Sequence, residues 1–302
     1  MATELDLIRQ LKKSTPAGPD IIEGIGDDTA VLKWDSQHYL LWTADFMVEG
    51  KHFRLPKDGA RQVGRKALAC SLSDIAAMGG IPTAALLSVG VPKRKASFLF
   101  PEILGGAKAL ARRFGVSIVG GDLVSSEKVA IDCTVLGKVE HSKLVLRSGA
   151  CAGNGLWVTG KLGGSLSSGR HLKFIPRIKE ARILGEWTRP LAMMDLSDGL
   201  ALDLVRLAEA SSVGAVVWPQ QIPFSRSSVT LKKALCDGED FELLVCLPSG
   251  LGEDFKMRFR KETGTGITQI GKILPRAGGL YLEDESGQRR PWPKGGYDAF
   301  AD

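Results

Sequence analysis

Acidic residues in this chain recur where apolar, strand-like runs meet glycine or serine. The first case is the turn Glu23-Gly24-Ile25-Gly26-Asp27-Asp28, which stands directly before an apolar run. Similar positions are held by Asp45, Asp74, Asp122, Asp195, Asp198, Asp237, Glu239 and Asp240. A solvated surface would scatter its acids, whereas α/β folds gather ligand-binding groups at the ends of their strands. The pattern therefore favours a fold that brings several strand ends around one shared site.

The first turn itself favours a bound cation. Gly24 and Gly26 allow backbone angles that other residues avoid, so the turn can be sharp and its carbonyls can approach a ligand. Asp27 and Asp28 repel each other, and a cation is the usual remedy. A solvated turn is the alternative, because Gly and Asp dominate turns. The recurrence of acids elsewhere in the chain favours the cation.

Composition places the chain among ordinary globular proteins. It has 302 residues, of which 44% are hydrophobic and 25% charged, and its formal net charge is +6. This length predicts two domains. No apolar run approaches the length of a membrane-spanning helix, so we expect no membrane association. The basic residues form no dense stripe with interleaved aromatics, which argues against a nucleic-acid partner.

The N-terminal segment and the cysteines indicate a cytoplasmic protein. Residues 1–8 are too acidic for a signal peptide and begin an amphipathic helix with Leu5, Ile8 and Leu11 on one face. The five cysteines are odd in number, far apart and without C-x-x-C spacing. We therefore expect free thiols in a reducing compartment, with neither a disulfide framework nor a zinc site.

Strand-like and helix-like segments alternate in both halves of the chain, which predicts an α/β or α+β fold. Strands are expected at residues 29–34, 38–43, 82–91, 116–119, 129–139, 156–159, 190–195, 214–218, 241–247 and 267–274. Helices are expected at residues 58–78, 97–114, 200–212 and 251–262, and a hairpin is expected to join 129–139 to 144–146. Small, flexible residues around 149–155 suggest a boundary. We therefore predict an N-terminal domain of residues 1–148 and a C-terminal domain of residues 149–302.

The common nucleotide-binding and hydrolytic motifs are absent. The nearest approach to a P-loop, from Gly59 to Lys66, has Arg65 in place of the lysine and no Ser or Thr after it. There is no GxSxG elbow, HExxH helix or EF-hand loop. The remaining oxygen-rich set of acids suits Mg²⁺. Because Mg²⁺ is usually shared between a few carboxylates and substrate phosphates, these acids predict phosphoryl transfer.

Short motifs follow one another along the chain in an order that resembles a known family. They are Gly24-Ile25-Gly26-Asp27-Asp28, Thr43-Ala44-Asp45 with residues 48–53, residues 72–79, Gly120-Gly121-Asp122, and residues 147–150, 195–200 and 238–244. This ordered set is similar to that of the thiamine-monophosphate kinase family, in the aminoimidazole-ribonucleotide-synthetase-like superfamily. The match runs from about Gly24 to Phe300, nearly the whole chain.

The resemblance implies ATP-dependent phosphorylation of thiamine monophosphate to thiamine diphosphate with several Mg²⁺ ions. It implies an N-terminal α/β domain that dimerises through its sheet, a C-terminal α+β domain, and a site between the two. The implied partners are therefore thiamine monophosphate, ATP and a second copy of the chain. No general base is expected, because the attacking phosphate oxygen is largely anionic at neutral pH.

Matching the motifs position by position implies roles for individual residues. The implied metal ligands are Asp28, Thr43, Asp45, Asp74, Asp122, Asp195 and Asp198. The implied ATP contacts are Gly121, Asp122, Arg147 and Ser197. The implied substrate contacts are His52, Glu239 and Tyr297.

Several of these residues also have an ordinary structural interpretation. Asp198 is placed to cap the helix expected after it, and Asp74 to be a surface acid on a helix. His52 can be a solvent-facing strand residue, and Glu239 can belong to a charged turn. We expect core positions for Trp34, Trp42 and Trp157.

Two considerations suggest rival functions: this sequence departs from the family pattern at one motif position, and other families share the superfamily. Ala44 stands where the family usually has threonine, which removes one oxygen ligand and motivates a non-catalytic ATP- and metal-binding sensor as the alternative. Another enzyme of the superfamily, acting on a different phosphorylated acceptor, is the nearest rival. Selenophosphate synthetase would carry a reactive cysteine near its N-terminus, whereas the first cysteine here is Cys70. The hydrogenase-maturation member would end in cysteine, whereas this chain ends at Asp302.

Overall fold

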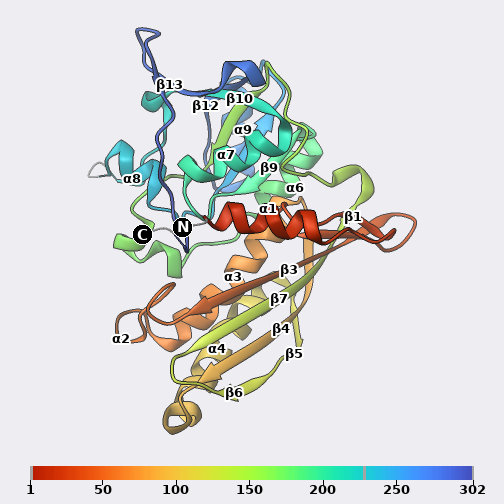
Figure 1. The fold of residues 1–302 in the computed structure, drawn as a ribbon, viewed down its shortest axis with the longest axis vertical. Coiled ribbons are helices and arrows are strands. Elements are labelled where there is room, and N and C mark those ends of the chain that lie inside the picture. Colours follow the sequence, from red (N-terminus) through yellow and green to blue (C-terminus); the bar gives the residue numbers. More distant parts are fainter. Residues whose placement is uncertain (1–2, 227–228, 301–302) are drawn as a thin grey trace.

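A computed structural model describes residues 3–226 and 229–300 of the protein. Two mixed β-sheets follow one another along the long axis of the molecule, each with helices packed against it (Figure 1). The strands of the first sheet end by residue 140, and those of the second begin at residue 155. This arrangement confirms the expected mixture of strands and helices in each half. The predicted boundary at residues 148 and 149 falls between the two sets of strands.

One face of the first sheet is buried and the other is open to solvent in this chain. The sheet has the order β1-β2-β3-β7-β4-β5, with β6 paired to β4, and its strands are β1 (Ile21–Glu23), β2 (Ala30–Lys33), β3 (His38–Val48), β4 (Ile81–Val91), β5 (Ser117–Gly120), β6 (Leu123–Ser125) and β7 (Ala130–Glu140). On β3, Leu41, Thr43 and Met47 are buried, whereas Trp42 and Phe46 are exposed. Because side chains alternate across a strand, the two faces are lined by different residues.

The second sheet is buried more completely. Its order is β14-β13-β10-β12-β8-β11-β9, and its strands are β8 (Gly155–Thr159), β9 (Ala192–Asp195), β10 (Val213–Val217), β11 (Leu243–Leu247), β12 (Ile267–Pro275), β13 (Leu280–Glu283) and β14 (Arg289–Pro291). Every residue of β8, β9 and β11 is buried. Burial on both faces explains why these strands are continuous apolar runs in the sequence.

Helix α3 (Ala60–Ala77) joins the two halves. It packs with α4 (Ala96–Phe114) against the inner face of the first sheet, and it also contacts α6 (Ile178–Trp187) and β9 of the second half. Its last residue, Ala77, belongs to an apolar cluster with Trp157. The remaining helices are α1 (Glu4–Ser14), α2 (Leu55–Asp58), α5 (Ser165–Ser168), α7 (Leu200–Ser211), α8 (Leu231–Cys236) and α9 (Glu253–Thr263). Short 3₁₀ turns occur at Lys93–Lys95, His141–Lys143, Arg170–Leu172, Pro219–Gln221 and Arg276–Gly278.

Helix α1 lies across the junction between the two sheets and contributes no fully buried residue (Figure 1). Polar contacts near the surface attach it to the rest of the molecule. Arg9 forms an ion pair with Glu209 at 2.7 Å, and the backbone N–H of Glu4 donates to Asp298 Oδ1 at 3.3 Å. The second contact brings the two ends of the chain together. The amphipathic helix expected at the N-terminus is thus confirmed.

The expected hairpin between residues 129–139 and 144–146 is wrong. β7 ends at Glu140 in a 3₁₀ turn, and the following residues pass to the second half of the molecule. There the carbonyl oxygen of Leu146 accepts a hydrogen bond from the N–H of Met193 at 3.0 Å. The apolar run at 144–146 reflects burial between the two halves rather than pairing within the first sheet.

Two of the three tryptophans expected in the core lie at the surface. Trp157 is only 1% exposed, as predicted, but Trp34 is 56% and Trp42 49% exposed. Trp42 lies on the open face of the first sheet beside other exposed apolar side chains. The sequence pattern alone does not distinguish such a face from a core, because both consist of alternating apolar residues.

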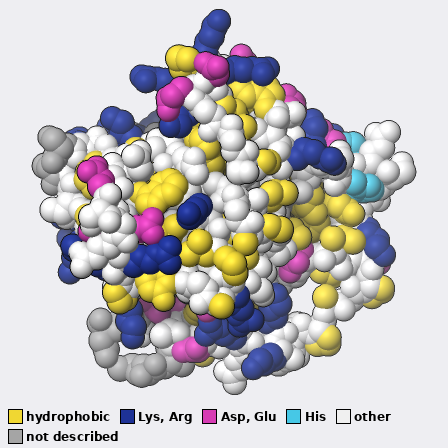
Figure 2. Space-filling view, turned by 90° about the horizontal axis from the view of Figure 1, so that it is seen from above, with side chains coloured by type: hydrophobic (Ala, Val, Ile, Leu, Met, Phe, Trp, Pro, Cys, Tyr) yellow, Lys and Arg dark blue, Asp and Glu magenta, His cyan; other side chains and the backbone are white. Residues whose placement is uncertain are grey.

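Charged side chains are mixed over the surface. Seen from above, Lys and Arg lie in several separate groups among acidic and apolar residues (Figure 2). Within residues 3–226 and 229–300, no helix combines the length and apolarity needed to cross a membrane.

The packing of α3 on α4 generates a stability prediction at two adjacent glycines. A Cβ at Gly106 would lie 1.8 Å from the backbone oxygen of Arg61, whereas a Cβ at Gly105 would meet only the flexible Nη1 of Arg61, at 2.8 Å. We expect Gly106→Ala to lower the free energy of unfolding by about 1–3 kcal/mol. Gly105→Ala, the matched control, should leave it unchanged or raise it by up to ~1 kcal/mol. Urea denaturation measures both, and equal losses would contradict this close helix contact.

Candidate active site

A cavity of about 1070 Å³ lies at the junction of the two sheets. Its walls come from α1, the glycine turn before β2, strand β3, the segment before α7, residues 237–241 and the C-terminal tail. The sequence-predicted site residues that line it are Asp28, Thr43, Asp45, His52, Arg147, Ser197, Asp198, Glu239 and Tyr297. Residues from distant parts of the chain therefore surround one space, which is large for a single small-molecule site.

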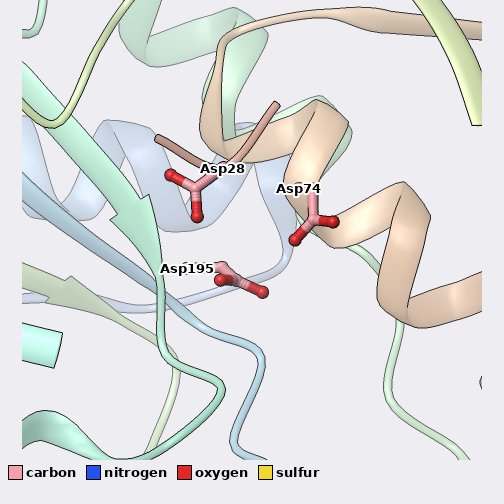
Figure 3. Close-up of side chains that lie close together, drawn as sticks. All are labelled: Asp28, Asp74 and Asp195. Carbon is pink, nitrogen blue, oxygen red and sulfur yellow. The ribbon is translucent and has the colours of Figure 1, made fainter. Parts of the chain in front are cut away.

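Three carboxylates meet beside this cavity (Figure 3). Asp28 comes from the turn before β2, Asp74 from α3 and Asp195 from the end of β9. An oxygen atom of each lies within 4.8 Å of an oxygen of the other two. A donor set made only of carboxylate oxygens at this spacing fits a hard divalent cation such as Mg²⁺.

Burial and mutual repulsion oppose the ionised forms of these acids. Burial, together with the charges of Asp45 and Asp195, raises the pKa of Asp74 well above its ordinary value. Burial and the charge of Asp28 likewise raise the pKa of Asp195, and burial raises the pKa of Asp45 to about 6. A nearby cation favours the ionised form of a carboxylate, so a bound divalent ion would reverse these shifts.

Hydroxyl groups orient the carboxylates. Each hydroxyl donates to one acid, in the pairs Ser73 with Asp195 at 2.6 Å, Ser71 with Asp45 at 2.9 Å, and Thr43 with Asp74 at 2.6 Å. Ser71, Ser73 and Asp74 all belong to α3, the helix that joins the two halves. The sequence interpretation missed both serines as site residues, although polar side chains inside an otherwise apolar helix were the available signal.

Arg147 lies on the segment that connects the two sheets and holds the glycine turn. Its Nε and Nη2 donate to Asp28 at 3.1 and 2.7 Å, and its backbone N–H donates to Asp27 at 3.0 Å. Gly26 has a φ of 117°, a conformation that favours glycine. Burial and the charge of Asp28 raise the pKa of Asp27 to about 7. The arginine thus fixes the turn that carries two of the acids.

A second arginine, Arg206 of α7, holds two other acids, Asp198 and Asp203. It forms an ion pair with Asp198 and donates to Asp203 at 2.9 Å. Asp203 accepts from the backbone N–H groups of Asp198 at 3.1 Å and Gly199 at 3.0 Å, so Asp203 and not Asp198 satisfies the start of α7. The capping interpretation of Asp198 is therefore wrong. The sequence interpretation missed Arg206 and Asp203.

His52 and Tyr297 lie together on the cavity wall, with ring centroids 6.3 Å apart. His52 Nδ1 accepts a hydrogen bond from the N–H of Val48 at 3.0 Å, which leaves the ring proton on Nε2. Burial and the charge of Lys66 lower the pKa of His52, which favours the neutral ring. His52 occupies a turn, so its interpretation as a strand residue is wrong.

The segment that carries Glu239 is strained. Glu239 and Phe241 adopt φ values of 53° and 50°, which residues other than glycine rarely adopt. Each such residue costs on the order of 1–3 kcal/mol, and such strain is common at functional sites. The backbone N–H of Glu239 donates to the carbonyl oxygen of Ser197 at 2.6 Å, which ties the segment to the loop before α7.

Four predicted site residues do not line the cavity within one chain: Asp74 and Asp195 lie beside it with Asp28, whereas Gly121 and Asp122 do not. Gly121 and Asp122 are exposed, and neither lines the cavity. They lie between β5 and β6, and the backbone oxygen of Asp122 accepts from the N–H of Val89 on β4. The sheet therefore holds them at a fixed place, outside the cavity.

Known sequences are similar to this chain over most of its length. The family described as AIR synthase related protein, N-terminal domain, matches residues 26–139. The thiamine-monophosphate kinase of Rhodopirellula baltica is 35% identical over 97% of this chain and 96% of its own length. That of Bacillus subtilis is 33% identical over 80% of this chain and 82% of its own.

Solved structures share the fold. The structure of AaThiL complexed with AMPPCP and TMP aligns with a TM-score of 0.84 and 28% identity, over 99% of this chain and 97% of that one. Hydrogenase maturation protein HypE in complex with ATP aligns with a TM-score of 0.69 at 18% identity, over 87% of each chain, which shows the fold alone. Because identity with the Rhodopirellula relative extends over almost the whole chain, the protein belongs to the thiamine-monophosphate kinase family and has the aminoimidazole-ribonucleotide-synthetase-like fold.

Proposed function

We propose that the protein transfers the γ-phosphoryl group of ATP to thiamine monophosphate, which yields thiamine diphosphate and ADP. The observation that carries this proposal is the meeting of Asp28, Asp74 and Asp195 beside a cavity of about 1070 Å³. Relatives named thiamine-monophosphate kinase support the acceptor, and the neighbour complexed with AMPPCP and TMP supports a nucleotide and a phosphorylated acceptor bound together.

The acids of this site are suited to hold Mg²⁺. Asp28, Asp74 and Asp195 form the central donor set, and Asp45, Asp198 and Thr43 stand around it as further oxygen donors. When bound there, Mg²⁺ neutralises phosphate charge. The serines of α3 keep the carboxylates in place, so their geometry is set before the ligands arrive.

The transfer needs positioning more than proton chemistry. An oxygen of the acceptor phosphate attacks the γ-phosphorus, and the bond from that phosphorus to the bridging oxygen of ADP breaks. The acceptor phosphate is largely a dianion at pH 7, since its second pKa is about 6, so no general base is required. Arg147 and Ser197, which line the cavity, would contact the phosphates of ATP.

The acceptor would lie against the wall formed by His52, Glu239 and Tyr297. The Nε2 proton of His52 is a hydrogen-bond donor, and the ring of Tyr297, 39% exposed, offers an aromatic face to a heterocycle. The cysteines bear on the cellular location. All five cysteines are free, which supports the cytoplasm as the location.

A homodimer formed through the first sheet would complete the site. The open face of this sheet exposes Trp42, Phe46 and Leu86, and the cavity lining includes Phe46 from that face. Asp122 directly precedes β6 of the same sheet, whose first residue, Leu123, is exposed. We propose that a second copy covers this face and supplies Gly121 and Asp122 to its partner's cavity.

The first test is incubation of the protein with ATP, Mg²⁺ and thiamine monophosphate, followed by chromatography of the thiamine phosphates. Asp45→Asn should reduce thiamine diphosphate formation roughly 100-fold or more, because it removes a charged ligand from the metal site. Asp20→Asn, at an exposed acid, is the control and should retain full activity. ATP binding without any product in the wild-type protein would favour the non-catalytic sensor instead.

The metal site also predicts that removal of one of its acids raises the stability of the metal-free protein and abolishes its response to Mg²⁺. Asp74→Asn removes an acid whose ionisation is opposed by burial and by its acidic neighbours, so the metal-free variant should melt roughly 2–4 °C higher than the wild type. Mg²⁺ should raise the melting temperature of the wild type and of the Asp20→Asn control, but not that of Asp74→Asn. Differential scanning calorimetry with and without Mg²⁺ measures this. A larger Mg²⁺ effect on Asp74→Asn than on the wild type would contradict the assignment.

The shared site predicts complementation between inactive variants. Mixing Asp45→Asn with Asp122→Asn after subunit exchange should restore roughly a quarter of wild-type activity, because half of the dimers are mixed and each has one intact site. Mixing Asp45→Asn with Asp74→Asn is the control and should restore none. No recovery in the first mixture, with mixed dimers shown to form, would place Asp122 in its own chain's site.

A further inference from the structure

We propose that Lys66 is a positioning residue that sets the affinity for the phosphate acceptor. It would act by holding both Glu239 and the turn of His52 in the geometry that receives the acceptor. The inference rests on the proposed kinase function and assigns a role to a residue outside the family's motifs described above.

Lys66 reaches across the junction between the two halves. It belongs to α3 and its side chain is 1% exposed, yet it lines the cavity. Its Nζ donates to Glu239 Oε1 at 2.5 Å and to the backbone oxygen of His52 at 2.8 Å. A single ammonium group thus contacts both of these acceptor-side residues.

A purely structural role does not account for this pair. Lysine is almost never fully buried unless it is paired, and a buried ion pair often adds no stability over apolar residues of the same size. Moreover, the pair is incomplete: Glu239 Oε2 is buried and has no hydrogen-bond partner among the described residues. A buried acceptor without a donor is unfavourable, so a ligand that brings a donor to this oxygen would relieve an unsatisfied hydrogen-bonding capacity.

The chemistry of the acceptor fits the free oxygen. Thiamine monophosphate carries a positively charged thiazolium ring and an amino group on its pyrimidine, and either would be attracted to a carboxylate oxygen at the cavity wall. Glu239 lies in a strained segment with a φ of 53°. Lys66 holds Oε1 of this residue, and no described residue donates to Oε2. The pair therefore selects for an acceptor with a cationic or amino-bearing heterocycle.

The experiment compares Lys66→Met with a matched control outside the cavity. Arg182 also joins the two halves, because it donates to Glu140 at 2.6 Å and to the backbone oxygen of Gly79 at 3.0 Å. Lys66→Met should raise the KM for thiamine monophosphate roughly tenfold or more, with the KM for ATP within about twofold of wild type. The KM of Lys66→Arg for thiamine monophosphate should lie between those of the wild type and Lys66→Met. Arg182→Met should leave both KM values unchanged.

A second readout separates positioning from general destabilisation. The double variant Lys66→Met/Glu239→Gln carries no unpaired buried charge, so it should fold even where Lys66→Met does not. Isothermal titration of thiamine monophosphate without ATP should show a larger loss of affinity in this variant than in Glu239→Gln alone, because Lys66 also holds the turn of His52. Wild-type affinity there, or a KM in Lys66→Met equal to that of Arg182→Met, would overturn the role of Lys66. If the wild type forms no thiamine diphosphate at all, the proposed function itself fails.

Discussion

The enclosure of several like charges in a small volume is the constraint on which the rest of this structure depends. Asp28, Asp74 and Asp195 come from three different elements and lie within 4.8 Å of one another. Such an arrangement lowers stability until a cation binds, so the free energy that maintains it must come from elsewhere. The apolar clusters around the two sheets supply this free energy. Helix α3 contributes residues to clusters in both halves, so Asp74 and the serines that it carries are held in a rigid frame.

Arginine meets the same constraint at some of these acids. Arg147 pairs with Asp28, one of the three clustered acids, and Arg206 pairs with Asp198 outside that cluster, while Asp74 receives only a hydroxyl hydrogen bond from Thr43 among the described residues. The cationic side chains thus offset part of the repulsion, and Asp74 is left without a cationic partner in the described part of the chain. Both arginines also line the cavity.

The sequence predicted the alternation of strands and helices from local patterns, and it predicted the convergence of Asp28, Asp45, Asp74, Asp195 and Asp198 but also that of Asp122, which the single chain does not show. Strand β4 and helices α3 and α4 fall within about one or two residues of expectation. What the sequence could not predict depends on distant partners. Residues 144–146 are apolar because they pack against the second half of the molecule. Trp42 lies on a sheet face that no part of the described chain covers.

The least accessible information was which polar residues support the site. Ser71 and Ser73 stand out only as polar residues among apolar ones, and the acids that they and Arg206 contact are identified only when α3 and α7 are placed around the site. Asp122 shows the converse limit. Its motif resembles a ligand motif, yet the fold of one chain does not bring it to the cavity.

Helix α1 has a consequence for inhibitor design. Leu5 and Ile8 form part of the cavity wall, but the helix buries no residue fully and is attached through exposed contacts such as Arg9 with Glu209. Exposed ion pairs contribute little stability and are weakened by salt. A compound that extends toward α1 would therefore displace the wall at low energetic cost, whereas extension toward α3 would meet a rigid core.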